Sequence, residues 1–311
     1  MSELGPVLAA FAVVQAAFIA VDTATLRRDA RAGAAPALRR LGLSAVLFLA
    51  AVWLVYFAIQ TAFLAALPPT EAVVEAVARV LGLSLAAADA TPGTVGLLVV
   101  ATYLVAGFWD YVLHRWLLHT PVGWLLHENH HLPTVVANGI PGISVRPFVA
   151  ATTLLTSLGT AVTMLGVMAL IGVTGLVAAY LRALPTLVLL LTVVGSASHS
   201  AFLRRFPALH RVLRMLGVTT PQEHVLHHAV GVAANYGNFT SFWDRVFRTY
   251  LPPAPADAPA PALGLAYDQD FLGTLTAGRW KLSMAVRARY RLEAFCHLHR
   301  RPGADHEEPA R

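Results

Sequence analysis

The chain has little charge and almost no cysteine. Only 13% of its 311 residues are charged, 57% are hydrophobic, and the mean hydropathy is +0.61. This composition excludes an ordinary soluble domain and favours a membrane protein. The single cysteine, Cys296, excludes an intrachain disulfide and a metal site built from thiolates alone. A metal bound by one chain would therefore be held mainly by nitrogen.

Several common enzyme motifs are also missing. The sequence contains no Walker A loop, no GxGxxG turn and no GxSxG elbow. The N-terminus lacks the basic region of a signal peptide, and its only early charge is Glu3. We therefore expect the first apolar run to be a retained helix.

Long apolar runs are abundant. A membrane-crossing helix needs roughly 20 apolar residues, and runs of about this length or longer cover residues 4–21, 41–67, 94–118 and 147–197. The last run is long enough for a hairpin of two spans, broken near Gly172, Gly175 and Pro185. We predict an all-α, multi-pass integral membrane bundle of about four or five transmembrane helices.

The basic residues are unevenly distributed among the predicted loops. The loop between the first two spans contains Arg27, Arg28, Arg31, Arg39 and Arg40, whereas the next loop is acidic. The positive-inside rule places the first loop, and the segments after residues 118 and 197, in the cytoplasm. We expect a protein of a bacterial cell membrane with a helical, histidine-rich cytoplasmic cap. The net charge of +6 then reflects topology, and we expect no nucleic-acid partner.

Composition divides the chain into three parts. Residues 1–93 would form membrane helices and an interfacial helix that begins at Thr70 as its N-cap, although its apolar stripe could equally pack against the bundle. Residues 94–250 would form the catalytic core. Residues 251–311 would form a Pro/Ala-rich linker and a basic tail, for which a helix on the membrane surface is favoured over the docking of an acidic electron-transfer protein.

Two pentads concentrate histidine, HENHH at 127–131 and HVLHH at 224–228. Positions i, i+3 and i+4 share one face of a helix, so each pentad can offer three imidazoles to one place. A lone histidine is usually a satisfied core residue, but coincidence does not explain two pentads of the same pattern. We therefore interpret both as sets of metal ligands.

Three further histidines complete the candidate site. His114 and His119 are five positions apart, about 140° around an ideal helix, so they should face different directions, and could serve different metals, unless the helix ends or distorts. His199 is the ninth candidate, while His210 and the tail histidines His297, His299 and His306 are left outside.

All nine candidates fall at or beyond the predicted cytoplasmic end of a span. Nine nitrogens are too many for a tetrahedral zinc site, but they suit two metals with four or five ligands each and open positions left over. Four polar residues could hold the ligands in place by hydrogen bonds to their outer ring nitrogens: Asp110, Asn235, Asp244 and Glu223. Alternatively, each could cap or solvate the end of a helix.

The order of these motifs resembles one family. HRWLLH, HENHH, the isolated histidine at 199 and HVLHH followed by NYGNFTSFWDRVFRTY resemble the fatty acid hydroxylase superfamily, also called the sterol desaturase family, over about residues 100–252. The resemblance implies a membrane-bound, non-haem di-iron oxygenase that uses dioxygen and two external electrons to hydroxylate or desaturate a lipid or other hydrophobic substrate. The implied iron ligands are His114, His119, His127, His130, His131, His199, His224, His227 and His228, supported by Asn235 and Asp244.

The sequence also departs from the family pattern. Phe247-Arg248-Thr249 stands where many members have Phe-Gly-Thr. The stretch after the second histidine motif, HENHH, does not match the pattern of sterol or fatty-acid enzymes. The resemblance therefore does not identify the substrate. No HPGG motif of cytochrome b5 is present. The resemblance therefore implies a separate electron donor of the ferredoxin or cytochrome b5 type.

Two other functions are compatible with parts of the sequence. HENHH also satisfies HExxH, with His127 and His131 as zinc ligands and Glu128 as the general base of a membrane metalloprotease. The metalloprotease hypothesis gives no role to His114, His119, His199 or the second pentad. A non-enzymatic metal- or haem-binding membrane protein should have polar ligands near the middle of its spans, where this sequence is apolar.

Overall fold

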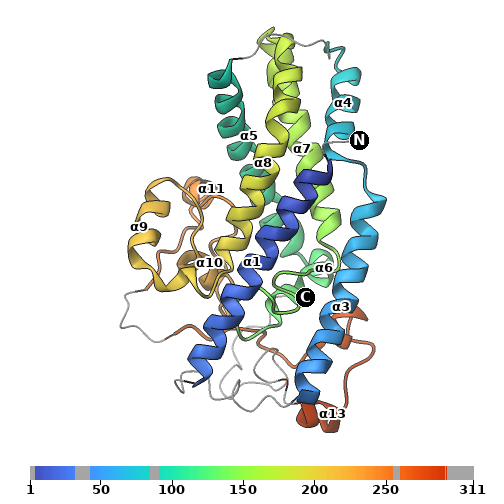
Figure 1. Ribbon diagram of the computed structural model, residues 1–311, viewed down its shortest axis with the longest axis vertical. Helices are drawn as coiled ribbons and strands as arrows, with labels where there is room; N and C mark the ends of the chain where they lie inside the picture. The colour runs from blue at the N-terminus through green and yellow to red at the C-terminus, as the bar shows by residue number, and fades with distance from the viewer. Residues whose placement is uncertain (1–3, 32–42, 85–90, 255–259, 291, 293–311) are drawn as a thin grey trace.

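The computed structural model describes residues 4–31, 43–84, 91–254, 260–290 and 292. In this part of the chain the fold is all-helical, with only isolated β-bridges, which confirms the predicted fold class (Figure 1). The long helices are α1 (Leu4–Arg31), α3 (Leu43–Ala66), α5 (Pro92–Leu113), α7 (Val149–Leu170) and α8 (Val177–Ser198). The shorter helices are α4 (Thr70–Val80), α6 (Pro121–His131), α9 (Pro207–Met215), α10 (Pro221–His227), α11 (Phe242–Val246), α12 (Phe271–Leu275) and α13 (Met284–Tyr290).

Among the described residues, four segments are long and apolar enough to cross a membrane: Leu43–Phe63, Pro92–Leu118, Ala151–Leu170 and Val177–Ser198. The protein is therefore a multi-pass membrane protein. The predicted first span lies within α1, but this helix continues to Arg31. The predicted break at Pro185 is wrong, because Pro185 lies inside α8, and the turn falls near Gly172, where φ is +73°. Neighbouring groups often compensate for proline in membrane helices.

Helices α4, α5, α7 and α8 form one half of the molecule (Figure 1). The helices α5 and α7 approach closely at Gly159, where a Cβ atom would lie 2.4 Å from the ring of Trp109. Helix α4 packs against α7 and α8 through its buried residues Val73 and Val74. Its N-cap is Pro69 and not the predicted Thr70, which is already the first helical residue.

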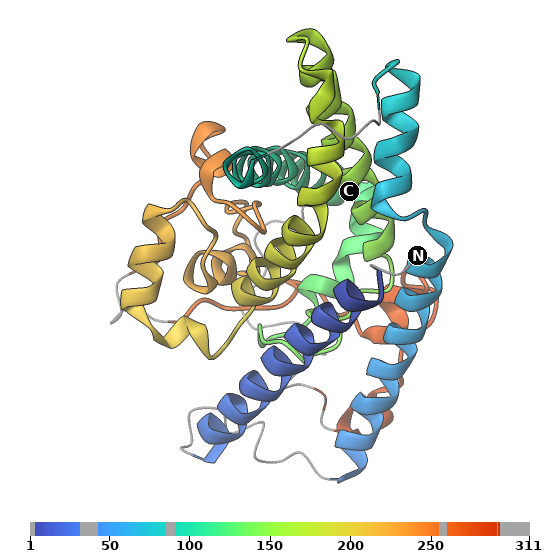
Figure 2. The ribbon, with the colours of Figure 1, turned by 45° about the horizontal axis from the view of Figure 1, so that its top comes forward.

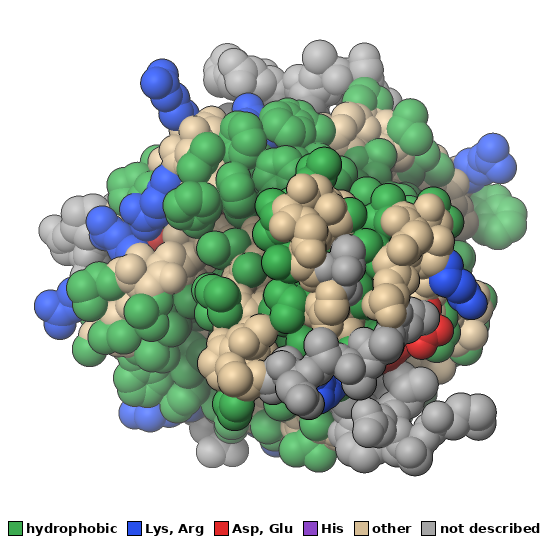
Figure 3. All heavy atoms as spheres, turned by 90° about the horizontal axis from the view of Figure 1, so that it is seen from above, with side chains coloured by type: hydrophobic (Ala, Val, Ile, Leu, Met, Phe, Trp, Pro, Cys, Tyr) green, Lys and Arg blue, Asp and Glu red, His purple; other side chains and the backbone are tan. Residues whose placement is uncertain are grey.

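The outer end of this half is mainly apolar on its surface. Figure 3 looks down on it: hydrophobic side chains cover most of the face, and basic side chains lie toward its margin. Val80 of α4 is 86% exposed and Leu170 of α7 is 87% exposed. Such an apolar surface is suited to contact with lipid.

The other half contains the histidine-bearing elements, with α1 and α3 beside them (Figures 1 and 2). Asp22 of α1 is fully buried and accepts hydrogen bonds from Asn138, after α6, and from Ser200 and Phe202, after α8. One carboxylate of the first helix therefore ties together the segments that follow His131 and His199.

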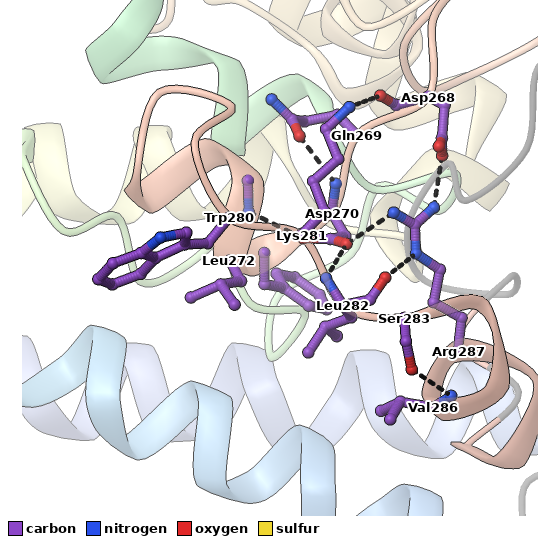
Figure 4. A network of polar contacts seen from close by, with 12 residues as sticks. Asp268, Gln269, Asp270, Leu272, Trp280, Lys281, Leu282, Ser283, Val286 and Arg287 are labelled. Atoms are coloured by element: carbon purple, nitrogen blue, oxygen red, sulfur yellow. Dashed lines mark hydrogen bonds and ion pairs between the residues drawn. The ribbon is translucent and has the colours of Figure 1, made fainter.

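The C-terminal segment is fixed beside α3 by a polar network (Figure 4). Arg287 is only 3% exposed, pairs with Asp268 at 2.6 Å and Asp270 at 2.9 Å, and donates to the carbonyl of Leu282. Phe271 packs edge-on against Tyr56 of α3. Residues 260–290 thus pack on the membrane helices, whereas Cys296, His297, His299 and His306 lie outside the described residues. The three-part domain division stays a prediction.

Candidate metal centre

The nine predicted histidines come together in two groups, and within each group the candidate ring nitrogens lie within 4.8 Å of one another. The five-histidine group consists of His114, His119, His127, His131 and His227. The four-histidine group consists of His130, His199, His224 and His228. His210 is in neither group and hydrogen-bonds Thr220 instead, at 2.8 Å. Two such clusters of imidazole are suitable for binding metals.

His114 and His119 share one group because the helix distorts between them. Residues His114–Leu118 form a π-helical turn, and the amide of His119 donates to the carbonyl of His114 at 3.2 Å. The wider π turn brings residues five apart onto nearly the same face. The expectation that the two could serve different metals is wrong, since it held only for an undistorted helix.

Each pentad is divided between the two groups. His127 and His131 belong to the five-histidine group, whereas His130 belongs to the four-histidine group. In HVLHH the assignment is reversed: His224 and His228 belong to the four-histidine group, and His227 belongs to the five-histidine group. The expectation that a pentad delivers all three imidazoles to one place is wrong, because positions i+3 and i+4 differ by about 100° around a helix. This difference lets each pentad reach two adjacent sites.

The Nδ1 atoms of four histidines point outward to backbone carbonyls. His114 contacts the carbonyl of Tyr236 at 2.5 Å and His130 that of Gly142 at 2.8 Å. His199 and His227 contact the carbonyls of Gly195 and Ala234 at 2.7 and 3.0 Å. A carbonyl can only accept, so each Nδ1 carries the hydrogen. The Nε2 atom of each neutral ring is then an unprotonated acceptor.

Two of these Nε2 atoms face each other without a proton between them, since His199 Nε2 lies 3.2 Å from His130 Nε2. His224 Nε2 lies 2.9 Å from His199 Nε2, and the buried His224 Nδ1 has no hydrogen-bond partner among the described residues. Facing lone pairs repel unless a cation lies between them. Burial lowers the pKa of His199 to about 3 and that of His130 well below its usual range, so protons do not fill this role near neutral pH. The donor set therefore fits metal ions.

Asp244 supports the segment that orients two of the ligands. Its carboxylate accepts hydrogen bonds from the amides of Tyr236 and Gly237 at 2.8 and 2.9 Å. Asn235, with a left-handed φ of 54°, donates from Nδ2 to the carbonyls of Glu223 and Leu251. Both residues fix the backbone whose carbonyl oxygens accept hydrogen bonds from His114 and His227. The supporting role predicted for both residues would therefore act through the main chain.

Asp110 is connected to His114 through an intermediate residue. Its oxygens accept from the amide and the side chain of Asn238 at 2.8 and 2.9 Å. The Asn238 side-chain nitrogen lies 3.2 Å from His114 Nδ1. Glu223 forms a capping box with Thr220 at the start of α10, the alternative role considered for it. Asn238 was not among the predicted site residues, although it lies within the NYGNF segment.

Glu128 points its carboxylate toward the C-terminal segment. Tyr267 donates its hydroxyl to Glu128 at 2.5 Å, and Gln269 lies 3.4 Å from the same oxygen. Trp124 in turn donates to the Tyr267 oxygen at 2.7 Å. Neither histidine group includes Glu128 or any other described carboxylate. This arrangement does not suit the general base of a metalloprotease, which must face metal-bound water.

We expect the metal-free protein to lose stability in acid. Burial lowers the pKa of eight candidate ligands: His119, His127, His130, His131, His199, His224, His227 and His228. Below about pH 6.5 these side chains bind protons in the unfolded chain but stay neutral in the folded one. Unfolding is thus favoured by up to about 1.4 kcal/mol per histidine for each pH unit.

Thermal melting of chelator-treated protein in detergent would measure this effect. The melting temperature should be steady above pH 7 and fall from about pH 6.5 downward, while metal-loaded protein should resist acid further. A metal-free melting temperature that is unchanged between pH 7 and pH 5 would contradict the neutral, proton-excluding histidine cluster.

The fold and the site define a membrane protein with two histidine clusters suitable for binding metals. Residues 99–249, which contain all nine candidate ligands, match the fatty acid hydroxylase family. The chain belongs to the fatty acid hydroxylase family, a family of oxidoreductases.

Two curated relatives match a short part of the chain. Both are beta-carotene hydroxylases of Paracoccus sp., from strains N81106 / MBIC 01143 and PC1. Each is 51% identical over 35 residues, which cover 11% of this chain and 22% of the relative. The chain therefore matches less than a quarter of the length of these relatives. No solved structure gives a significant match.

Proposed function

We propose that this protein is a di-iron oxygenase that hydroxylates, or alternatively desaturates, a lipid or other hydrophobic substrate. The observation that supports it most directly is the pairing of two histidine groups, each of which includes two rings whose Nδ1 is bonded to a backbone carbonyl and whose Nε2 is unprotonated. Family membership supports iron over the other metals that imidazole binds. The short similarity to beta-carotene hydroxylases supports an apolar substrate.

The overall reaction requires a reductant. Hydroxylation consumes one dioxygen, two electrons and two protons for each C–H bond converted to C–OH, and releases one water. When bound, two iron ions would supply the redox chemistry that activates dioxygen. The chain itself buries eight of the nine imidazoles, with His119 half-buried, and backbone carbonyls orient four of them. A separate ferredoxin or cytochrome b5 type protein would deliver the electrons, at a site that the arginine distribution places on the cytoplasmic side.

Metal analysis and isotope labelling test this proposal. Protein purified without oxygen should contain about two irons per chain, one for each group. Cells that express the gene under oxygen-18 should contain a lipid with one labelled hydroxyl group, or a new double bond, that is absent without the gene. Active protein that contains only zinc, or the absence of any oxidised lipid, would overturn the proposal.

Replacement of Glu128 by glutamine distinguishes the oxygenase from the metalloprotease. Glutamine keeps an oxygen that can accept the Tyr267 hydroxyl, so the variant should retain both metals and most of its oxygen-dependent activity. A protease that used Glu128 as general base would lose at least about 100-fold in rate. The measurements are iron content and oxygen-18 incorporation, and retention of metal with complete loss of activity would instead assign chemistry to Glu128.

A further inference from the structure

Helix α9 has an apolar face that no part of the described chain covers. None of its residues is buried, and it lies at the outside of the group that it forms with α10 and α11 (Figures 1 and 2). Ala208, Val212 and Met215 recur at helical spacing and are exposed, and Leu216, directly after the helix, is 71% exposed. A surface helix usually turns such a face toward the core. This face of α9 is therefore available to contact something outside the chain.

Helix α11 extends the apolar surface of a membrane span. Its Trp243 donates a hydrogen bond from the indole nitrogen to the carbonyl of Leu104 at 2.9 Å, and Leu104 lies within the candidate span Pro92–Leu118. On the same short helix, Phe242 and Val246 are exposed. Because α11 is attached to the side of the span, these two apolar side chains lie at the edge of the region that lipid would occupy.

Hydrogen bonds connect the end of α9 to the start of α11. The carbonyl of Gly217, just after α9, accepts from the hydroxyl of Thr240 at 2.6 Å and from the amide of Ser241 at 3.0 Å. Ser241 is the N-cap of α11. The end of α9 that carries Met215 and Leu216 is therefore next to α11. An exposed apolar surface that continues from a span over two short helices is typical of a segment at the membrane interface.

Positive charge borders this surface. Residues 201–250 contain six arginines but only two acids, Glu223 and Asp244, and both acids are buried. Arg211 and Arg214 are exposed on one flank of the apolar face of α9, and among the described residues neither has an ion-pair partner. A basic flank beside an exposed apolar face complements the negative headgroups of an anionic membrane.

We propose that α9 and α11 form an interfacial surface that binds anionic phospholipid in the leaflet nearest the histidine groups. Met215, Leu216 and Phe242 contact the boundary between headgroups and acyl chains, while Arg211 and Arg214 pair with the negative headgroups. The positive-inside rule assigns this leaflet to the cytoplasmic side. A soluble acidic protein is a poorer occupant, because the apolar surface is continuous with a span that lipid surrounds. The inference involves no metal ligand and is independent of the proposed oxygenase function.

Fluorescence quenching by brominated lipids tests this inference in the full-length protein. Cys296→Ser removes the single cysteine, and Met215→Cys then carries a bimane label in reconstituted vesicles. Brominated phosphatidylcholine should quench the label, and brominated phosphatidylglycerol should quench it more strongly, with a preference that weakens at high salt. Arg211→Gln and Arg214→Gln should each lower the local preference for phosphatidylglycerol about fivefold, equivalent to about 1 kcal/mol.

Two controls accompany these variants. Leu97→Cys places the label at an exposed position of α5 within the span, where both lipids should quench it equally. Arg279→Gln removes an exposed arginine from the segment after α12 and should leave the preference at the Met215→Cys label unchanged. A Met215→Cys label that neither lipid quenches would show that α9 faces water, as expected for a soluble acidic partner, and would overturn the inference. Equal quenching by both lipids, or a preference that persists in both α9 arginine variants, would also overturn it.

Discussion

Replacing His227 with alanine should remove metal from the five-histidine group and lower the oxygen-dependent activity at least about 100-fold, because even the partners of metal ligands typically matter 10–100-fold. The Nε2 atom of His227 lies 3.3 Å from that of His119, and its Nδ1 is fixed by the carbonyl of Ala234. Alanine removes the donor and leaves this carbonyl unpaired. Iron content by mass spectrometry and oxygen-18 incorporation are the measurements.

His210→Ala is the matched control for this variant. His210 lies ten residues from Thr220, contacts its hydroxyl, and belongs to neither histidine group. The control should keep both metals, with a modest loss of stability because Thr220 caps α10. A fully metallated and active His227→Ala protein would remove His227 from the ligand set. Equal metal loss in the control would indicate that the site depends on general stability.

Replacing Gly142 with alanine should have a large effect, because this position combines a left-handed backbone with a close main-chain contact. Gly142 has a φ of +87°, and a Cβ atom there would lie 2.1 Å from the backbone oxygen of Asn129, within the HENHH box. Its own carbonyl receives His130 Nδ1. Backbone strain alone costs about 1–3 kcal/mol, and a clash with main chain adds to it. We expect at least about 3 kcal/mol of destabilisation and loss of metal from the four-histidine group.

Gly166→Ala provides the corresponding control within α7. A Cβ atom at Gly166 meets no atom within 4 Å, so alanine there should be neutral or stabilise the helix by up to about 1 kcal/mol. Thermal melting in detergent and metal content should be measured for both variants. A Gly142→Ala protein that melts like Gly166→Ala and keeps two metals would show that this turn does not position His130.

The nine candidate ligands could be found from the sequence, because six of them form two pentads with helical spacing and the order of the boxes resembles one family. The division of the candidates between two groups could not be predicted. The π turn at His114–Leu118 depends on how the end of α5 packs, and it reverses the conclusion that ideal helix geometry gives for His119. The division of each pentad likewise depends on the position of α10 relative to α6, which no local pattern encodes.

Several supporting residues were beyond sequence analysis for the same reason. Asp22 and Asn138 are 116 positions apart, and Arg287 and Asp268 resemble ordinary members of a basic tail and a linker. Their burial becomes evident only in the folded chain.

The attachment of Tyr267 to Glu128 has a consequence for how the protein is made. The two residues are separated by 139 positions, which a ribosome translates in roughly 7 to 28 s at about 5–20 residues per second. During this interval the HENHH box has been synthesised, but the segment that Arg287 fixes has not. Glu128 therefore gains its Tyr267 contact only when the last part of the chain docks beside α3.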